Sequence, residues 1–231
     1  MRSHLGFEAA AAVLGCKSTV GATLDCKSRW TCFSLRRVHS VRSVCKVKAL
    51  LDTVSAPKSL IMTVNAGDIS ADHWTQDPDV GGGRIIGEGC HFIDLLRHLT
   101  GSEIVRSRIV TLGANDALSV REDKAVITLE FGDGSVGVIN YLANGHKAVP
   151  KERLEVFALG RVLQMDNYRR LRSYGWPGIK SRKSWKQDKG QNACHSAFVN
   201  AIKTGGGTPI PLEEIIESSR VSIELASHVE R

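Results

Sequence analysis

Alternating hydrophobic and polar residues mark the middle of the chain as β-sheet. Leu60, Met62 and Val64 alternate with Ile61, Thr63 and Asn65, which predicts a strand with one buried face. Short glycine-containing turns at 131–135 and 159–161 separate later apolar runs, so we expect hairpins and antiparallel neighbours. The further runs that predict strands are 104–112, 124–131, 135–143, 152–159 and 161–167.

Helical spacing of apolar residues appears on both sides of these runs. In one segment they are Ile86, Cys90, Ile93, Leu96 and Leu99. Gly101 stands where a helix C-cap belongs, and a second helix is expected over 190–203. Pro211, followed by two glutamates, opens a third helix, and another begins near Val38. Because the strands outnumber the helices and mostly follow one another, the pattern predicts an α+β fold with an open, largely antiparallel β-sheet.

The net charge of +7 lies in the first part of the chain. Residues 1–51 contain nine Lys and Arg but only two acidic residues, and the remaining residues carry 22 of each sign. A duplex-binding domain carries its positive excess on the folded part, so nucleic acid is an unexpected partner. No run of about 18 apolar residues occurs, which argues against a membrane-spanning helix.

We expect residues 1–35 to be a disordered or non-native leader and residues 36–231 to form the domain. The apolar stretch 5–16 also suits a signal peptide, and the Arg- and Ser-rich run 27–48 suits an organellar transit peptide. The six cysteines form no C-x-x-C pair and match no zinc spacing, so no metal site is expected. Free thiols in a reducing, cytoplasmic compartment are the simplest interpretation.

The strongest chemical motif is G-G-G-R-I-I-G-E-G-C-H-F-I-D over residues 81–94. Its glycines allow the backbone to approach a ligand closely. His91 is expected near the start of a helix, where a neutral imidazole suits acid–base chemistry. Asp94 lies three residues further on, shares a helical face with His91 and is expected to orient it.

This motif resembles the G-G-G-x-x-x-D-x-G-x-H-x-x-D signature of the glucose–fructose oxidoreductase/inositol dehydrogenase (Gfo/Idh/MocA) family. The likeness continues through 127–135, 155–160 and 206–211, and it covers roughly residues 35–230. It corresponds to the family's C-terminal domain, and the bi-domain oxidoreductases are the most similar subgroup. The resemblance implies a sheet with helices packed on one face, a second face that pairs subunits, and a histidine that acts where hydride is exchanged.

The sequence departs from the family pattern in two ways. Gly87 stands where the family has Asp, and Glu88 beside it is the candidate substitute, with a side chain expected to point in a different direction. The family's N-terminal Rossmann domain is missing, and no G-x-G-x-x-G lies between an expected strand and an expected helix. The family implies NAD or NADP as cofactor, but we expect no binding by this chain alone. His91, Asp94 and Glu88 are the expected catalytic residues.

The expected substrate-binding residues lie in three places. Arg84 belongs to the glycine-rich motif, and Asn144, His146 and Lys147 follow a strand, where they either line the pocket or form a polar turn. Tyr174 and Trp176 belong to a basic and aromatic cluster over 168–189. That mixture suits the base and diphosphate of a sugar nucleotide, single-stranded nucleic acid, or a solvated loop anchored by an aromatic residue.

Three functions follow as hypotheses. In the first, the chain is the substrate-binding, catalytic-histidine domain of an NAD(P)-dependent sugar or sugar-nucleotide oxidoreductase, present as a fragment or working with a separate nucleotide-binding chain. In the second, it is a non-catalytic remnant that assembles homo-oligomers through its sheet. In the third, it binds nucleic acid through 168–189. Both alternating residue sets along 124–143 are partly apolar, which favours self-association through the sheet.

Overall fold

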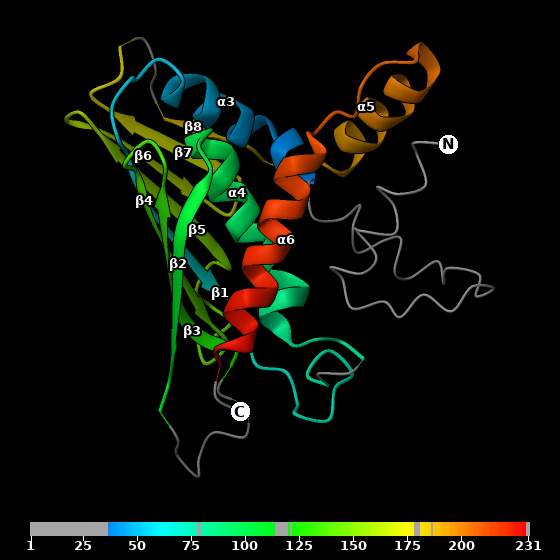
Figure 1. Cartoon of the computed structure of the whole chain (residues 1–231). Coiled ribbons are helices and arrows are strands. Elements are labelled where there is room, and N and C mark those ends of the chain that lie inside the picture. The colour runs from blue at the N-terminus through cyan, green and yellow to red at the C-terminus, as the bar shows by residue number, and fades with distance from the viewer. Residues whose placement is uncertain are drawn as a thin grey trace.

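A computed structural model describes residues 37–77, 80–113, 120, 122–177, 181–185 and 187–229. The expected leader at 1–35 lies outside the described residues. The described part is one open sheet with helices on one face, as the sequence predicts (Figure 1). Searched over these residues, no helix is both long and apolar enough to cross a lipid bilayer.

The sheet has eight strands in the order β2-β3-β4-β1-β5-β6-β7-β8. Their bounds are Ile104–Thr111 for β2, Lys124–Phe131 for β3, Val136–Leu142 for β4, Ser59–Asn65 for β1, Glu152–Ala158 for β5, Arg161–Asp166 for β6, Arg170–Tyr174 for β7 and Arg182–Lys183 for β8. The strands expected from residue 60 to residue 167 are therefore confirmed. β7 and β8 were not predicted, because Leu171 is flanked by arginines and offers no apolar alternation.

Strand β1 lies in the middle of the sheet and joins its two halves. It pairs with β4 in parallel and with β5 antiparallel, so that Met62 faces Ile139 on one side and Leu154 on the other. The other pairs are antiparallel. The outer end of β1, at Asn65, therefore lies beside the end of β4 and the start of β5.

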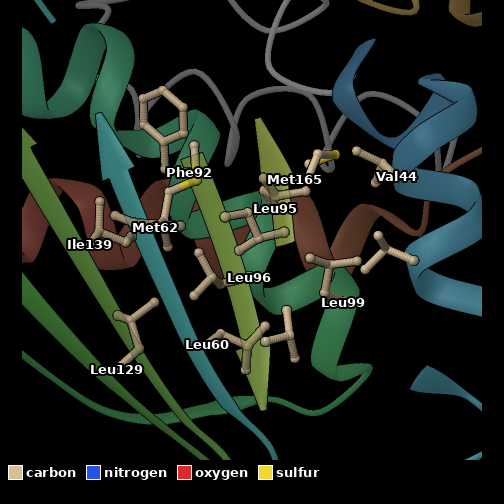
Figure 2. Packing of buried hydrophobic residues seen from close by; sticks show 14 of the residues in the cluster. Val44, Leu60, Met62, Phe92, Leu95, Leu96, Leu99, Leu129, Ile139 and Met165 are labelled. Atoms are coloured by element: carbon tan, nitrogen blue, oxygen red, sulfur yellow. The ribbon is translucent and has the colours of Figure 1, made fainter. Parts of the chain in front are cut away.

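Helices α3 (Arg42–Leu51), α4 (Cys90–Thr100) and α6 (Leu212–Ser227) cover one face of the sheet (Figure 1). A 3-10 turn, η1 (Arg37–Ser40), precedes α3, and a π-helical turn, η2 (Ile85–Gly89), precedes α4. Gly101 closes α4 with φ +70°, as expected. The core forms where α4 meets the central strands, with Leu95 and Leu96 lying against Leu60 and Met62 (Figure 2).

Helix α5 (Gln191–Thr204) was predicted within a residue, but it packs differently from the other helices. None of its residues is buried, and Ile202 is 67% exposed. In Figure 1 it projects away from the sheet. Its apolar side therefore adds nothing to the core described above.

The second face of the sheet carries no described helix (Figure 1). Side chains on this face include Val126, Val136 and Phe157, each between 39% and 45% exposed. Charged pairs lie among them, including Arg106 with Glu130 at 3.1 Å. This face is thus a mixture of valine, aromatic and paired charged side chains.

Candidate functional site

The glycine-rich turn leads into a helical segment that begins earlier than the sequence suggests. Gly82 and Gly83 have φ values of +72° and +83°, which other residues rarely adopt. Helical backbone then starts at Arg84 and continues through η2 directly into α4. His91 is therefore inside a continuous helical segment, and the open N-terminus lies seven residues before it. π-helical turns of this kind are frequent at functional sites.

A pocket lies beside His91, at the start of β5. Its charged and polar lining residues are Glu88, His91, Lys151, Glu152 and Lys189. Val41, Phe92 and Tyr168 supply the apolar part of the wall. We call this the His91 pocket. The structure thus brings the two predicted residues Glu88 and His91 together, as their i, i+3 spacing allows.

Glu88 accepts side-chain hydrogen bonds from three residues in and around this pocket. Its Oε1 accepts a hydrogen bond from Lys151 Nζ at 2.6 Å. Its Oε2 accepts hydrogen bonds from the Tyr141 hydroxyl at 2.5 Å and from Arg84 Nη2 at 2.9 Å. Burial by itself raises the pKa of Glu88, but the three hydrogen bonds and the charge of Lys151 outweigh it and lower that pKa to about 2.

Arg84 lies beneath this pocket rather than on its surface. The side chain is 4% exposed, and it donates hydrogen bonds to the carbonyl oxygens of Gly67 at 2.6 Å and Ala66 at 3.2 Å. Its guanidinium also lies 3.7 Å from the fully buried Asp123 and 5.3 Å from the ring centre of Tyr141. These contacts make Arg84 a structural support for Glu88; substrate binding by Arg84 stays a prediction.

The loop after β4 is fastened to the end of β1 by Asn65. The Asn65 amide nitrogen Nδ2 donates hydrogen bonds to the carbonyl oxygens of His146 at 2.9 Å and Val149 at 3.1 Å. Its backbone N–H donates to the carbonyl of Lys151 at 2.7 Å. Sequence reasoning missed both Asn65 and Lys151, because their partners are distant in the chain and no local motif includes them.

A second pocket lies beside this loop, and we call it the loop pocket. Asn65, Asp68, Lys147, Lys151 and Asn167 supply its polar lining. Of the expected substrate-binding residues, Lys147 lines it, while Asn144 and His146 are exposed on the same turn. Lys151 lines both pockets, which makes it the residue that joins them.

Asp94 lies on α4 and is 1% exposed. One oxygen lies 2.8 Å from Nε2 of His39, and the other accepts a hydrogen bond from the Ser218 hydroxyl at 3.3 Å. His39 stacks on His98 with ring centres 3.8 Å apart. Burial, with the nearby His39 and Lys48, lowers the pKa of His98 to about 3. These contacts join α4 to η1 and α6, and the orienting role of Asp94 toward His91 stays a prediction.

The structure separates Tyr174 and Trp176 from the His91 pocket. Tyr174 pairs with Val162 and is 52% exposed, on the face of the sheet away from α4. Trp176 is buried, with the Arg161 guanidinium 5.0 Å from its ring centre. Neither is among the described residues that line the two pockets. Tyr168 and Lys189, from the two ends of the basic and aromatic cluster over 168–189, do line the His91 pocket, so the described part of this cluster is divided between the pocket, the core and the outer face.

Across the part of the chain that the structure describes, no group of three or more His, Cys, Asp or Glu side chains is arranged to hold a metal ion. Cys45, Cys90 and Cys194 are free thiols. Burial raises the pKa of the Cys90 thiol far above its usual range. That thiol, beside His91 in the sequence, is therefore a poor nucleophile.

Residues 57–163 match the family model of the GFO/IDH/MocA C-terminal domain. A comparison with curated protein sequences gave no match. Among solved structures, the fold is similar to a UDP-N-acetylglucosamine 3-dehydrogenase from Acidithiobacillus ferrooxidans, with 21% identity and a TM-score of 0.62 over 85% of this chain and 60% of that chain.

Two further solved structures share the fold. An aldose–aldose oxidoreductase from Caulobacter crescentus, complexed with glycerol, matches with 18% identity and a TM-score of 0.63 over 84% of this chain and 60% of that one. An oxidoreductase from Agrobacterium radiobacter, in complex with NAD+, L-tartaric acid and magnesium, matches with 16% identity and a TM-score of 0.60 over 83% and 61%. The chain therefore spans about three fifths of the length of these proteins.

Proposed function

Because this chain carries a GFO/IDH/MocA C-terminal domain over residues 57–163, we propose that it is the substrate-binding and catalytic-histidine domain of an NAD(P)-dependent oxidoreductase acting on a sugar or sugar-nucleotide hydroxyl. The observation that supports this most directly is the shared pocket of Glu88, His91 and Lys151. The names of two similar structures, a UDP-N-acetylglucosamine 3-dehydrogenase and an aldose–aldose oxidoreductase, support a carbohydrate substrate.

The proposed role of His91 is to accept a proton. Oxidation of a hydroxyl group to a carbonyl removes a proton from the hydroxyl oxygen and a hydride from the carbon that carries that oxygen. A neutral imidazole takes a proton well near neutral pH, and His91 lies in the wall of a small pocket beside Glu88 and Lys151. Asp94 is proposed to orient the imidazole from the same helix.

The residues of this chain do not fit a dinucleotide cofactor. Its sequence contains no G-x-G-x-x-G between a strand and a helix, and the described sheet has a single parallel pair, β1 with β4. A pyrophosphate site of the Rossmann type needs a glycine-rich turn between a parallel strand and a helix N-terminus. NAD or NADP is therefore assigned to a nucleotide-binding domain outside the residues of this sequence, and calorimetry of these 231 residues with either cofactor should give no micromolar binding.

The test of the proposed function is a chimera in which a nucleotide-binding domain from a similar sugar dehydrogenase precedes residue 37. We expect the chimera to reduce NAD+ or NADP+ when a sugar is present. Loss of a general base typically lowers such a rate about 10²–10⁴-fold. The His91→Asn chimera should show that loss while unfolding at nearly the same denaturant concentration as the parent. Near-normal turnover of the variant would reject the catalytic role of His91.

A second candidate function is homo-oligomer assembly through the outer face of the sheet. Val126, Val136 and Phe157 are partly exposed there, and exposed apolar patches usually mark interfaces. Assembly and catalysis are compatible, so the mass of the chain in solution tests this candidate separately. The three free thiols among the described residues support a proposed cytoplasmic location.

A further inference from the structure

We propose that Lys151 contacts the substrate in the His91 pocket and that Glu88 is the residue that positions its ammonium group. The inference deepens the proposed function and rests on it, because both concern the same pocket. It assigns Glu88 a fixed electrostatic role and gives the role of hydrogen-bond donor to a lysine from a different part of the chain.

The Glu88 carboxylate accepts hydrogen bonds from two buried side chains, Arg84 and Tyr141, which are themselves held in place. Arg84, which is 4% exposed, is itself fixed by the carbonyl oxygens of Ala66 and Gly67. Tyr141 is fully buried in β4 and donates its hydroxyl hydrogen to Oε2. Both groups bind Oε2, and the other oxygen, Oε1, is left to Lys151. The carboxylate is therefore a rigid anchor for the ammonium group.

Glu88 is poorly suited to carry a proton itself. Its carboxylate accepts three hydrogen bonds, two of them from cationic groups. Such a carboxylate remains ionised at neutral pH and holds a proton too weakly to serve as a base for a hydroxyl. The negative charge at this position instead stabilises the charged form of the Lys151 side chain.

Lys151 is held both at its backbone and at its ammonium group, and its side chain is still partly exposed to the pocket. Its backbone carbonyl accepts a hydrogen bond from the Asn65 N–H, and its ammonium donates to Glu88. The side chain is 40% exposed and lines both pockets. An ammonium has three N–H groups, and within the described part of the chain Glu88 is its only acceptor. Two donors, held in a preorganised position, remain for a ligand oxygen.

The charges around the His91 pocket favour an uncharged ligand. Lys151 is paired with Glu88, and Lys189 lies 3.8 Å from Glu152. The positive and negative charges within each pair cancel. The pocket therefore offers hydrogen-bond donors and acceptors side by side without a net charge. That arrangement suits the hydroxyl groups of an uncharged sugar or polyol better than a carboxylate or phosphate.

The experiment observes the lysine ammonium groups of the full chain directly by ¹H–¹⁵N NMR, with the Lys151 signal identified as the one lost in Lys151→Arg. Uncharged probes (glycerol, D-glucose and myo-inositol) and D-gluconate are titrated separately. We expect an uncharged probe to shift the Lys151 signal together with the backbone amides of His91 and Phe92. Lys151→Met should weaken that probe about tenfold, as loss of a hydrogen bond to a charged group does. Lys151→Arg should restore part of the affinity, and the control Lys203→Met on α5 should bind as the wild type does.

Glu88→Gln tests the positioning role, because it keeps the shape of the side chain and removes its charge. We expect the Lys151 ammonium signal to exchange faster with water and the probe to bind about tenfold more weakly. Wild-type affinity in Glu88→Gln would overturn that role. Thermal unfolding of each variant reports whether the fold is retained.

Other outcomes separate this inference from the proposed function. Binding that shifts His91 and Phe92 but leaves Lys151 unmoved, with normal affinity in Lys151→Met, would overturn the role of Lys151 and leave the proposed function intact. A response to gluconate alone would overturn the assignment of an uncharged ligand. If no probe shifts any residue of the pocket, the inference and the proposed sugar-binding function both fail.

Discussion

A Cβ atom placed on Gly145 would lie 2.0 Å from Oδ1 of Asn65. The same asparagine holds the loop through the carbonyl groups of His146 and Val149. The absence of a side chain at residue 145 is therefore what allows Asn65 to fasten the loop that leads to Lys151.

Gly145→Ala should detach this loop. Because the new methyl group and the Asn65 amide cannot occupy the same space, two hydrogen bonds are expected to break, at a cost of about 1–3 kcal/mol. Hydrogen exchange of the amides over residues 146–151 should become faster. Gly207→Ala is the matched control, because a Cβ atom there meets nothing within 4 Å. Equal exchange rates in both variants would contradict the prediction.

Glu88 should make the stability of the protein depend on acid pH. Its pKa is lowered from 4.5 to about 2 in the folded chain, so its contribution is complete above about pH 4.5 and is lost as pH falls toward 2. The shift corresponds to roughly 3 kcal/mol. In urea unfolding at pH 7 and at pH 3, Glu88→Gln should lose less stability between the two pH values than the wild type. An identical loss in both proteins would show that Glu88 is not responsible.

Tyr141→Phe removes one of the three donors to Glu88 and leaves the ring in place. We expect the pKa of Glu88 to rise, and the free energy of unfolding at pH 7 to fall by about 1.5–3 kcal/mol. The pKa is measured by carbon-detected NMR of the glutamate carboxyl groups. A pKa that stays near 2 would show that Lys151 and Arg84 hold the carboxylate without the hydroxyl.

Glu217 should be important for the packing of α6 against the rest of the domain. Its two oxygens accept hydrogen bonds from Arg97 Nε at 2.9 Å and from the backbone N–H of Ile104 at 2.5 Å. Arg97 and Glu217 are each 13% exposed. Glu217→Ala leaves a mostly buried cation and a backbone donor without this partner, at a cost of about 2–4 kcal/mol. The control Glu224→Ala, from an exposed pair with Arg220, should change stability by about 0.5 kcal/mol or less.

A charge on the outer face of the sheet should prevent self-association. We expect light scattering to give a dimeric or tetrameric mass for the wild type at micromolar concentration and a monomeric mass for Phe157→Arg. Burying an unpaired guanidinium in an interface is strongly unfavourable. Val80→Arg is the control, because Val80 is exposed but lies outside the sheet. A monomeric wild type would remove the basis for an interface on this face.

The period-2 and helical patterns were sufficient to predict most of the sheet and α4. Ile127 and Leu129 point to the core as their alternation requires, and Gly101 ends α4 in the left-handed conformation. The pattern could not reveal that β1 pairs with β4 in parallel, because strand order depends on contacts between distant residues. β7 was missed because Arg170 and Arg172 alternate with a single buried leucine, Leu171.

The candidate site was predictable only where its residues are close in the sequence. Glu88 and His91 belong to one motif, and their i, i+3 spacing is a signal that they share a side of the helix. Lys151 comes from the start of β5, and Asn65 from the end of β1, so their meeting depends on the strand order. Tyr174 and Trp176 were grouped by composition, but the alternation of β7 sends Tyr174 to the far face of the sheet.

The central place of β1 has a consequence for how the chain folds. Ser59, in β1, pairs with Val136 in β4 and with Phe157 in β5, both far along the chain. β1 therefore leaves the ribosome well before either neighbouring strand has been synthesised. β2, β3 and β4 can pair with one another by local hairpins, but closing the long loop to β1 carries an entropy cost that slows folding. Asn65 can fasten its loop only after that step. The pocket therefore forms late, when both halves of the sheet have joined.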